Sequence, residues 1–98
     1  RARVACVPMA THRILFYDYV DGIVERRAPY REAHLASIRA ERETGRLLMA
    51  GALGDPPHGG AFVFKDVEAG QIEQFVKADP YFEAGLVTDW RIEPWNVV

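Results

Sequence analysis

The sequence predicts an α+β protein in which four strands and two helices follow the order β-α-β-β-α-β. Two segments with helical periodicity alternate with four segments that are rich in β-branched and aromatic residues. The chain has 98 residues, of which 49% are hydrophobic and 27% charged. This length and composition are typical of one globular domain with a modest core.

The first half of the chain supplies two strands and a helix. Residues 13–20 form a β-branched and aromatic run that ends at the turn signal Asp21-Gly22. A helix is expected from Pro29, which suits a first turn, to Thr44, with Gly45 providing the left-handed stop. Residues 47–53 are nearly uncharged and predict a second strand buried on both faces.

The second half repeats this arrangement after a Pro- and Gly-rich loop over residues 54–60. A short strand is expected over residues 61–64, and Asp66 is expected to cap the second helix. That helix must end near Ala78 because Pro80 cannot lie deep within it. Alternating residues 86–93 predict the fourth strand, which leaves the sheet at Pro94.

This element order predicts the ferredoxin-like split βαβ arrangement, a four-stranded antiparallel sheet with both helices on one face. The other face is then bare. Apolar strands and large rings would make that face larger than the apolar patch a soluble monomer exposes. We therefore expect a homodimer, a dimeric α+β barrel in which two sheets cover each other. The rings expected to contribute are Phe16, Tyr17, Tyr19, Phe62, Phe64 and Trp90.

Composition and charge narrow the function classes. The net charge of −2 provides no basic stripe for nucleic acid, and no apolar run is long enough for a membrane span. The single cysteine, Cys6, argues against a disulfide framework and predicts a reducing compartment, the cytoplasm. Residues 1–12 form an Arg-rich N-terminal segment before the domain at 13–98. Residues 1–8 suit an upstream extension, an organelle-targeting remnant, an expression remnant or an extra edge strand.

His34 is the first candidate for chemistry. On the first helix, helical spacing aligns it in one stripe with Arg31, Leu35, Ile38 and Arg42. The stripe places the imidazole on, or beside, the face that meets the sheet. The ring then either forms structural hydrogen bonds within the core or presents a free nitrogen to a cavity between helix and sheet.

Asp79 is the second candidate. An Asp followed by Pro is a good helix opening, so one alternative is that Asp79 only caps one extra turn through Pro80 and Tyr81. A capping role leaves room for chemistry, because a carboxylate has two oxygens. One can accept a backbone N–H while the other orients His34, as in a base paired with an orienting acid.

The remaining candidates are weaker. Arg31, Tyr81 and Phe16 are the residues we expect to contact a substrate, although the two rings also suit a core or a dimer interface. His58 in the loop suits a solvated surface position. Arg26-Arg27 could bind an anionic substrate or could form a solvated helix entrance. The histidine spacing predicts no metal site, and the glycines form no nucleotide-binding loop, so we expect no cofactor.

Four segments together resemble the YCII-related family: residues 31–35, 45–51, 78–81 and 84–86. The resemblance spans roughly Arg13 to Trp95, and it implies a fold similar to the dimeric α+β barrels. It also implies that His34 and Asp79 correspond to the family's active-site histidine and aspartate. At least one member is a dehydrochlorinase that acts on a chlorinated hydroxyhydroquinone.

Two functions are therefore expected. The first is a small cofactor-independent enzyme of the isomerase, lyase or dehydrochlorinase type, in which His34 moves a proton and Asp79 orients it. Its substrate would be a small ring or enol-like compound. The second is a non-catalytic dimeric module that binds a small molecule or serves assembly, with His34 and Asp79 as a structural pair.

Overall fold

The computed structural model describes residues 10–98 and shows one antiparallel sheet in the order β2-β3-β1-β4 with helices against it. The predicted ferredoxin-like α+β fold is confirmed. Residues 1–9 lie outside the described part, and with them the expected extension or edge strand. None of the helices within residues 10–98 has the length and apolar character that a membrane crossing requires.

The elements follow one another with short connections. In chain order they are β1 (His12–Tyr19), α1 (Ile23–Arg26), the 3-10 turn η2 (Ala28–Tyr30), α2 (Arg31–Glu43), β2 (Leu47–Leu53), β3 (Gly59–Lys65), α3 (Ala69–Ala78), α4 (Pro80–Glu83) and β4 (Val87–Trp95).

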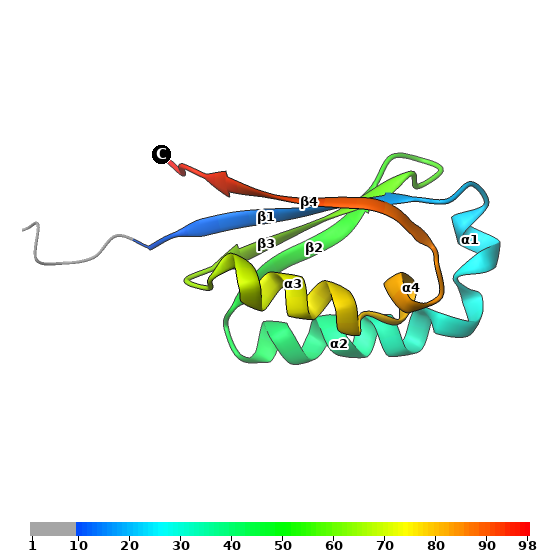
Figure 1. The fold of residues 1–98 in the computed structure, drawn as a ribbon, viewed down its shortest axis with the longest axis horizontal. Helices are drawn as coiled ribbons and strands as arrows, with labels where there is room; N and C mark the ends of the chain where they lie inside the picture. Colours follow the sequence, from blue (N-terminus) through cyan, green and yellow to red (C-terminus); the bar gives the residue numbers. More distant parts are fainter. Residues whose placement is uncertain (1–9) are drawn as a thin grey trace, which may run out of the picture.

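The molecule has two layers. Figure 1 shows α2 and α3 lying side by side against one face of the sheet, with α4 at the end of α3, whereas no helix of residues 10–98 covers the other face. The central strand β1 pairs with β3 on one side and β4 on the other, so it joins the two halves of the chain. The core fills the space between the sheet and the helices.

Alternation along β1 decides which rings enter this core. Leu15 and Tyr17 are buried on the helix side, beside Phe62 and Phe64 of β3. The prediction that six large rings contribute to the open face is therefore wrong for most of them. Phe16 lies on the open face, because it has the opposite parity from its two buried neighbours. The other rings are buried in the core or packed against it: Tyr17, Tyr19, Phe62, Phe64 and Trp90.

The strand β2 has the predicted bounds, but the prediction that it is buried on both faces is wrong. It lies at the edge of the sheet, and Met49 is 63% exposed. A strand in a two-layer fold is covered on one face only, so its apolar residues on the other face remain accessible.

The helix starts also differ from expectation. The segment around Pro29 forms the 3-10 turn, and α2 proper begins at Arg31. Asp66 is not the cap of α3; its φ of 56° turns the chain, and its carboxylate accepts from the backbone N–H of Thr11 at 2.9 Å. The cap is Glu68, which forms a reciprocal capping box with Gln71.

Candidate functional site

His34 lies in the first turns of α2, where it is the buried residue of that helix with 5% of its surface exposed. Its half-buried neighbours Leu35 and Ile38 follow at helical spacing and face the same side. The predicted stripe therefore places the imidazole between α2 and the sheet.

Asp79 occupies the junction between α3 and α4. Its extended backbone (φ −72°, ψ 126°) is the conformation that a following proline requires, so α3 ends there and Pro80 begins α4. One carboxylate oxygen, Oδ1, accepts from the backbone N–H of Tyr81 at 3.0 Å, as an N-cap does. The capping role predicted for Asp79 is thus present, and only 1% of the residue is exposed.

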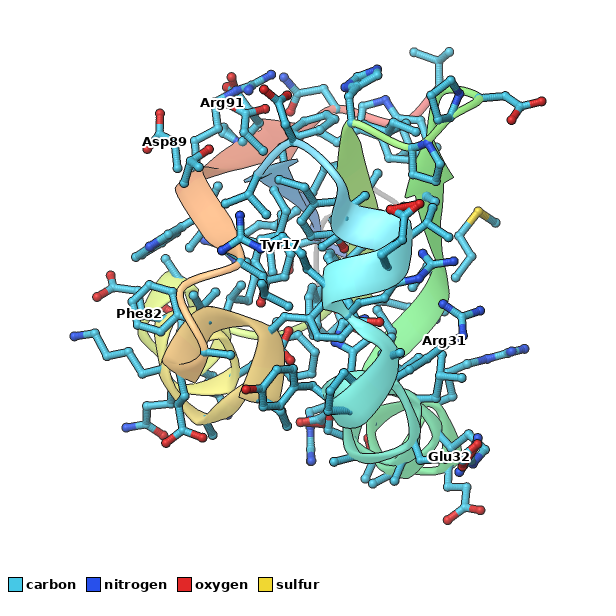
Figure 2. All side chains as sticks on the ribbon, turned by 90° about the vertical axis from the view of Figure 1, so that its right-hand side faces the viewer. Tyr17, Arg31, Glu32, Phe82, Asp89 and Arg91 are labelled. Atoms are coloured by element: carbon cyan, nitrogen blue, oxygen red, sulfur yellow. The ribbon has the colours of Figure 1, made fainter. Side chains whose placement is uncertain are left out.

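The same carboxylate joins three elements in one buried network. His34 Nδ1 lies 2.8 Å from Asp79 Oδ1, although the two residues are 45 positions apart in sequence. The hydroxyl of Tyr17, on β1, donates to Asp79 Oδ2 at 2.7 Å. Figure 2 shows Tyr17 in the space between sheet and helices. Both oxygens of the carboxylate therefore accept hydrogen bonds from buried groups.

This network fixes the proton on the imidazole. An ionised carboxylate accepts hydrogen bonds only, so Nδ1 of His34 carries a hydrogen and Nε2 of the neutral ring has a free lone pair. The ring of Tyr81 stacks on the imidazole with centroids 3.7 Å apart and planes at 6°, which holds its orientation. Nε2 has no hydrogen-bond partner within residues 10–98 and retains access to the cavity that His34 lines.

The cavity has a volume of about 410 Å³ and lies between α2 and the edge strand β2. This volume is within the range of small-molecule sites. Apolar atoms come from Leu35, Ile38 and Phe62, and small residues of β2 leave room opposite the helix. Polar groups come from Tyr19, Tyr81, His34 and four arginines: Arg27, Arg31, Arg39 and Arg42.

Three tyrosines around the network remain protonated. Burial, the largest effect, and the nearby Asp79 carboxylate raise the phenol pKa of Tyr17 and of Tyr19 above its ordinary value. Burial also raises the phenol pKa of Tyr81, against the lowering effect of Arg31 and Arg27. These phenols are therefore neutral hydrogen-bond donors near neutral pH.

The structure brings four of the five predicted site residues together. His34 and Asp79 are hydrogen-bonded, and Tyr81 and Arg31 line the cavity. Phe16 is not brought to the site: it lies on the open face of the sheet, where the guanidinium of Arg91 stands 4.3 Å from its ring centroid. Figure 2 shows Arg31 beside α2, and Arg91 on the far side of the sheet. Successive side chains of β1 point to opposite faces of the sheet, so Phe16 points away from the face that carries the cavity.

Sequence reasoning missed Tyr17 as part of the site. The signal was available in principle, because a buried tyrosine needs a partner for its hydroxyl and β1 alternation puts Tyr17 on the same face as Leu15. Arg39 is not a member of the predicted stripe, yet it also lines the cavity. Long side chains reach beyond the position that their Cα occupies on the helix. Residues 10–98 contain no cluster of three or more His, Cys, Asp or Glu suited to a metal ion.

Comparisons with known proteins agree with this arrangement. Residues 10–96 match the YCII-related domain. The chain is 32% identical over 92 residues to protein YciI of Escherichia coli, with 83% of this chain and 91% of YciI covered.

Solved structures share the fold. One is a 5-chloro-2-hydroxyhydroquinone dehydrochlorinase from Burkholderia phenoliruptrix in complex with 2,5-dihydroxybenzoquinone (TM-score 0.71, 20% identity, 87% of this chain and 93% of that chain). Another is a dimeric ferredoxin-like protein of unknown function from Thermobifida fusca (TM-score 0.51, 12% identity, 91% and 92%). At these identities the structures support the fold alone, whereas the domain match and the relative establish membership. The chain belongs to the YCII-related family.

Proposed function

We propose that this protein is a small cofactor-independent enzyme that performs acid/base chemistry on a ring-sized or enol-like compound. The observation that carries the proposal is the position of His34 between a buried carboxylate and a cavity. One ring nitrogen lies 2.8 Å from Asp79, and the other has no hydrogen-bond partner within residues 10–98 and lies on the cavity side. This is the geometry of a general base with an orienting acid.

In the proposed reaction, Nε2 of His34 takes a proton from a C–H or O–H group of the substrate. The bonding pair stays on the substrate as an enolate or phenolate, and His34 becomes an imidazolium stabilised by the Asp79 carboxylate. An isomerase returns the proton to a different atom. In a dehydrochlorinase the electron pair instead forms a double bond while the C–Cl bond breaks, so chloride leaves and the proton passes to water.

The similarity in fold to the Burkholderia phenoliruptrix dehydrochlorinase favours dehydrochlorination over isomerisation. Its activity is the removal of chloride from a hydroxylated ring, and its bound compound is a single six-membered ring. A cavity of about 410 Å³ accommodates a compound of that size. The apolar side chains of Leu35, Ile38 and Phe62 would limit water beside the imidazole and so strengthen electrostatic interactions in the site.

A turnover assay tests the proposal. The protein is incubated without oxygen with 5-chloro-2-hydroxyhydroquinone, and chloride release is measured. Enolisable cyclic ketones and lactones are incubated in D2O, and deuterium incorporation is measured. We expect turnover in at least one of these reactions. His34→Gln should lower its rate about 10²- to 10⁴-fold, the usual contribution of a general base.

The matched control is His58→Gln, which changes an exposed loop histidine. It should retain the wild-type rate, and circular dichroism should show that both variants are folded. If His34→Gln turns over the same compound as fast as His58→Gln, the proposed role of His34 is wrong. If the wild-type protein turns over none of these compounds, the second function remains: a binding module in which the His34–Asp79 hydrogen bond is structural.

We further propose that the protein forms a homodimer through the open face of the sheet. Ile14 and Phe16 of β1, Val63 of β3 and Met49 of β2 lie on this face, whereas β4 presents charged residues beside them. The apolar part of this face, formed by β1, β2 and β3, suits a two-fold dimer in which the patch of one subunit contacts the same patch of the other. The Thermobifida fusca protein of similar fold is described as dimeric, which supports self-association.

Met49→Glu tests the dimer. Met49 is 63% exposed, so its replacement should leave the fold intact, and a two-fold interface would bring two new carboxylates into the apolar patch. We expect wild-type protein to sediment as a dimer and Met49→Glu as a monomer. Val24→Glu, at an apolar position of α1 that is 45% exposed, is the matched control and should remain dimeric. A wild-type monomer, or a dimer that is unaffected by Met49→Glu, would contradict the proposal.

A further inference from the structure

The cavity beside His34 has a strongly one-sided charge. Four arginines line it, from the segment before α2 and along α2 itself, and no aspartate or glutamate is among its lining residues. The chain as a whole has a net charge of −2. The positive charge is therefore concentrated locally, and a concave site with one sign of charge attracts ligands of the opposite sign.

These arginines are largely free of partners. Within residues 10–98, Arg39 has one ion pair, a long 3.9 Å contact with Glu32 in which both side chains are mostly exposed. In the same part of the chain, Arg27, Arg31 and Arg42 form no ion pair. By contrast, Arg46 outside the cavity is held by Glu41 through two nitrogens, at 3.1 and 2.9 Å. The cavity guanidiniums thus retain the donors that match a carboxylate or another oxyanion.

The hydroxyl of Tyr81 is a buried polar group beside Arg31 at the wall of the cavity. Tyr81 is 1% exposed and lines the cavity, yet its hydroxyl oxygen is buried without a hydrogen-bond partner in the described structure. The guanidinium of Arg31 is close enough to lower the phenol pKa without providing a hydrogen bond of normal geometry. A ligand could accept a hydrogen bond from this hydroxyl only after a side chain moves, because the oxygen has no accessible surface. The binding groups that the cavity exposes are therefore the arginines.

We infer that the cavity binds a small organic anion whose charged oxygen is held by Arg31 and Arg27. This inference rests on the proposed function, because it assigns the substrate class of the same cavity. The charged group would occupy the arginine side, and the atom that loses a proton would face Nε2 of His34. Proton removal adds negative charge to the substrate, and the guanidiniums would stabilise that charge as it develops.

Benzoate and benzamide are suitable probes because they have nearly the same shape and differ in charge. Each is titrated at low salt into ¹⁵N-labelled protein, and the NMR signals of His34 and Tyr81 are followed. We expect benzoate to bind at least about 10-fold more tightly than benzamide, as the loss of a charge-assisted hydrogen bond predicts. Added sodium chloride should weaken benzoate binding, because the arginines are partly exposed to solvent.

The variant series uses two residues of the same type near the same place. Arg31→Gln should lower the affinity for benzoate about 10-fold or more. Arg26→Gln removes the same charge from an exposed arginine that does not line the cavity, and it should change the affinity less than about 2-fold. Arg31→Lys, which keeps the charge but not the planar fork, should fall between them.

Each remaining outcome decides the inference. Equal binding of benzamide, equal effects of Arg31→Gln and Arg26→Gln, or no binding of benzoate would each overturn it. Inorganic phosphate is titrated in parallel, and phosphate binding as tight as that of benzoate would replace the organic anion with an inorganic one. His34→Gln should retain benzoate binding while it loses turnover. If benzoate binds as expected but no turnover depends on His34, the proposed enzyme is refuted and this inference stands.

Discussion

Replacement of Asp79 by alanine is expected to lower the free energy of unfolding by about 3 to 5 kcal/mol. The Asp79 carboxylate accepts three hydrogen bonds at a position that is 1% exposed: from Tyr17, His34 and the backbone of Tyr81. Alanine would leave all three donors buried without an acceptor and would remove the cap of α4. A domain of this size has a total stability of about 5 to 15 kcal/mol, so much of it depends on this carboxylate.

Asp79→Asn separates the loss of charge from the loss of acceptors. The amide oxygen can still accept from His34 and Tyr81, and the Tyr17 hydroxyl can rotate to accept from the new NH2 group. We expect a cost of about 1 to 2 kcal/mol, well below that of alanine. Asp89→Ala, at an exposed position of β4, serves as the control and should change stability by less than about 0.5 kcal/mol. Urea denaturation measures all three. Similar values for Asp79→Ala and Asp89→Ala would contradict a network of this kind.

The second large effect is a loss of stability in alkaline solution. The phenol pKa values of Tyr17 and Tyr19 are raised by burial and by Asp79, so both groups stay protonated in the folded protein above pH 10. In the unfolded chain they ionise near pH 10. Above that pH the unfolded state binds fewer protons than the folded state. The free energy of unfolding should then fall by about 1.4 kcal/mol per pH unit for each tyrosine, or about 2.8 kcal/mol for the pair.

Thermal or urea unfolding between pH 8 and pH 11 measures this slope. Below the unfolded pKa these tyrosines contribute no pH dependence, so the decline should begin near pH 10. Tyr81, whose phenol pKa is also raised by burial, adds to the same decline. Tyr17→Phe should make the slope smaller by about 1.4 kcal/mol per pH unit, because one titrating group is gone. A stability that is constant to pH 11, or a slope that Tyr17→Phe does not alter, would show that the phenols are not buried as described.

Much of this fold follows from local sequence. The bounds of β2 match the prediction residue for residue, because charged residues and Gly45 mark its start and the loop marks its end. The end of α3 at Ala78 follows from the steric effect of Pro80. The contact between His34 and Asp79 follows from the predicted topology. The ferredoxin-like fold places both helices on one face of the sheet, so a residue on the first helix can lie close to the end of the second.

The remaining features of the fold and the site cannot be predicted from local sequence patterns. Alternation tells which residues of a strand share a face, but β1 and β3 have apolar residues at both parities, so the pattern does not say which parity the helices cover. Phe16 and Tyr17 are the example: one lies on the open face and the other donates to Asp79. The short helix α1 was missed because four residues contain too little periodicity to distinguish a helix from a loop.

The proposed chemistry depends on which nitrogen of His34 carries the proton, and long-range ¹H–¹⁵N NMR correlation measures this directly. In the neutral ring, the hydrogen bond from Nδ1 to Asp79 predicts a protonated Nδ1 and an Nε2 with the shift of an unprotonated nitrogen. Asp79→Asn should weaken this preference. A neutral His34 with the proton on Nε2 in the wild-type protein would contradict the account, because that ring would have no basic nitrogen facing the cavity.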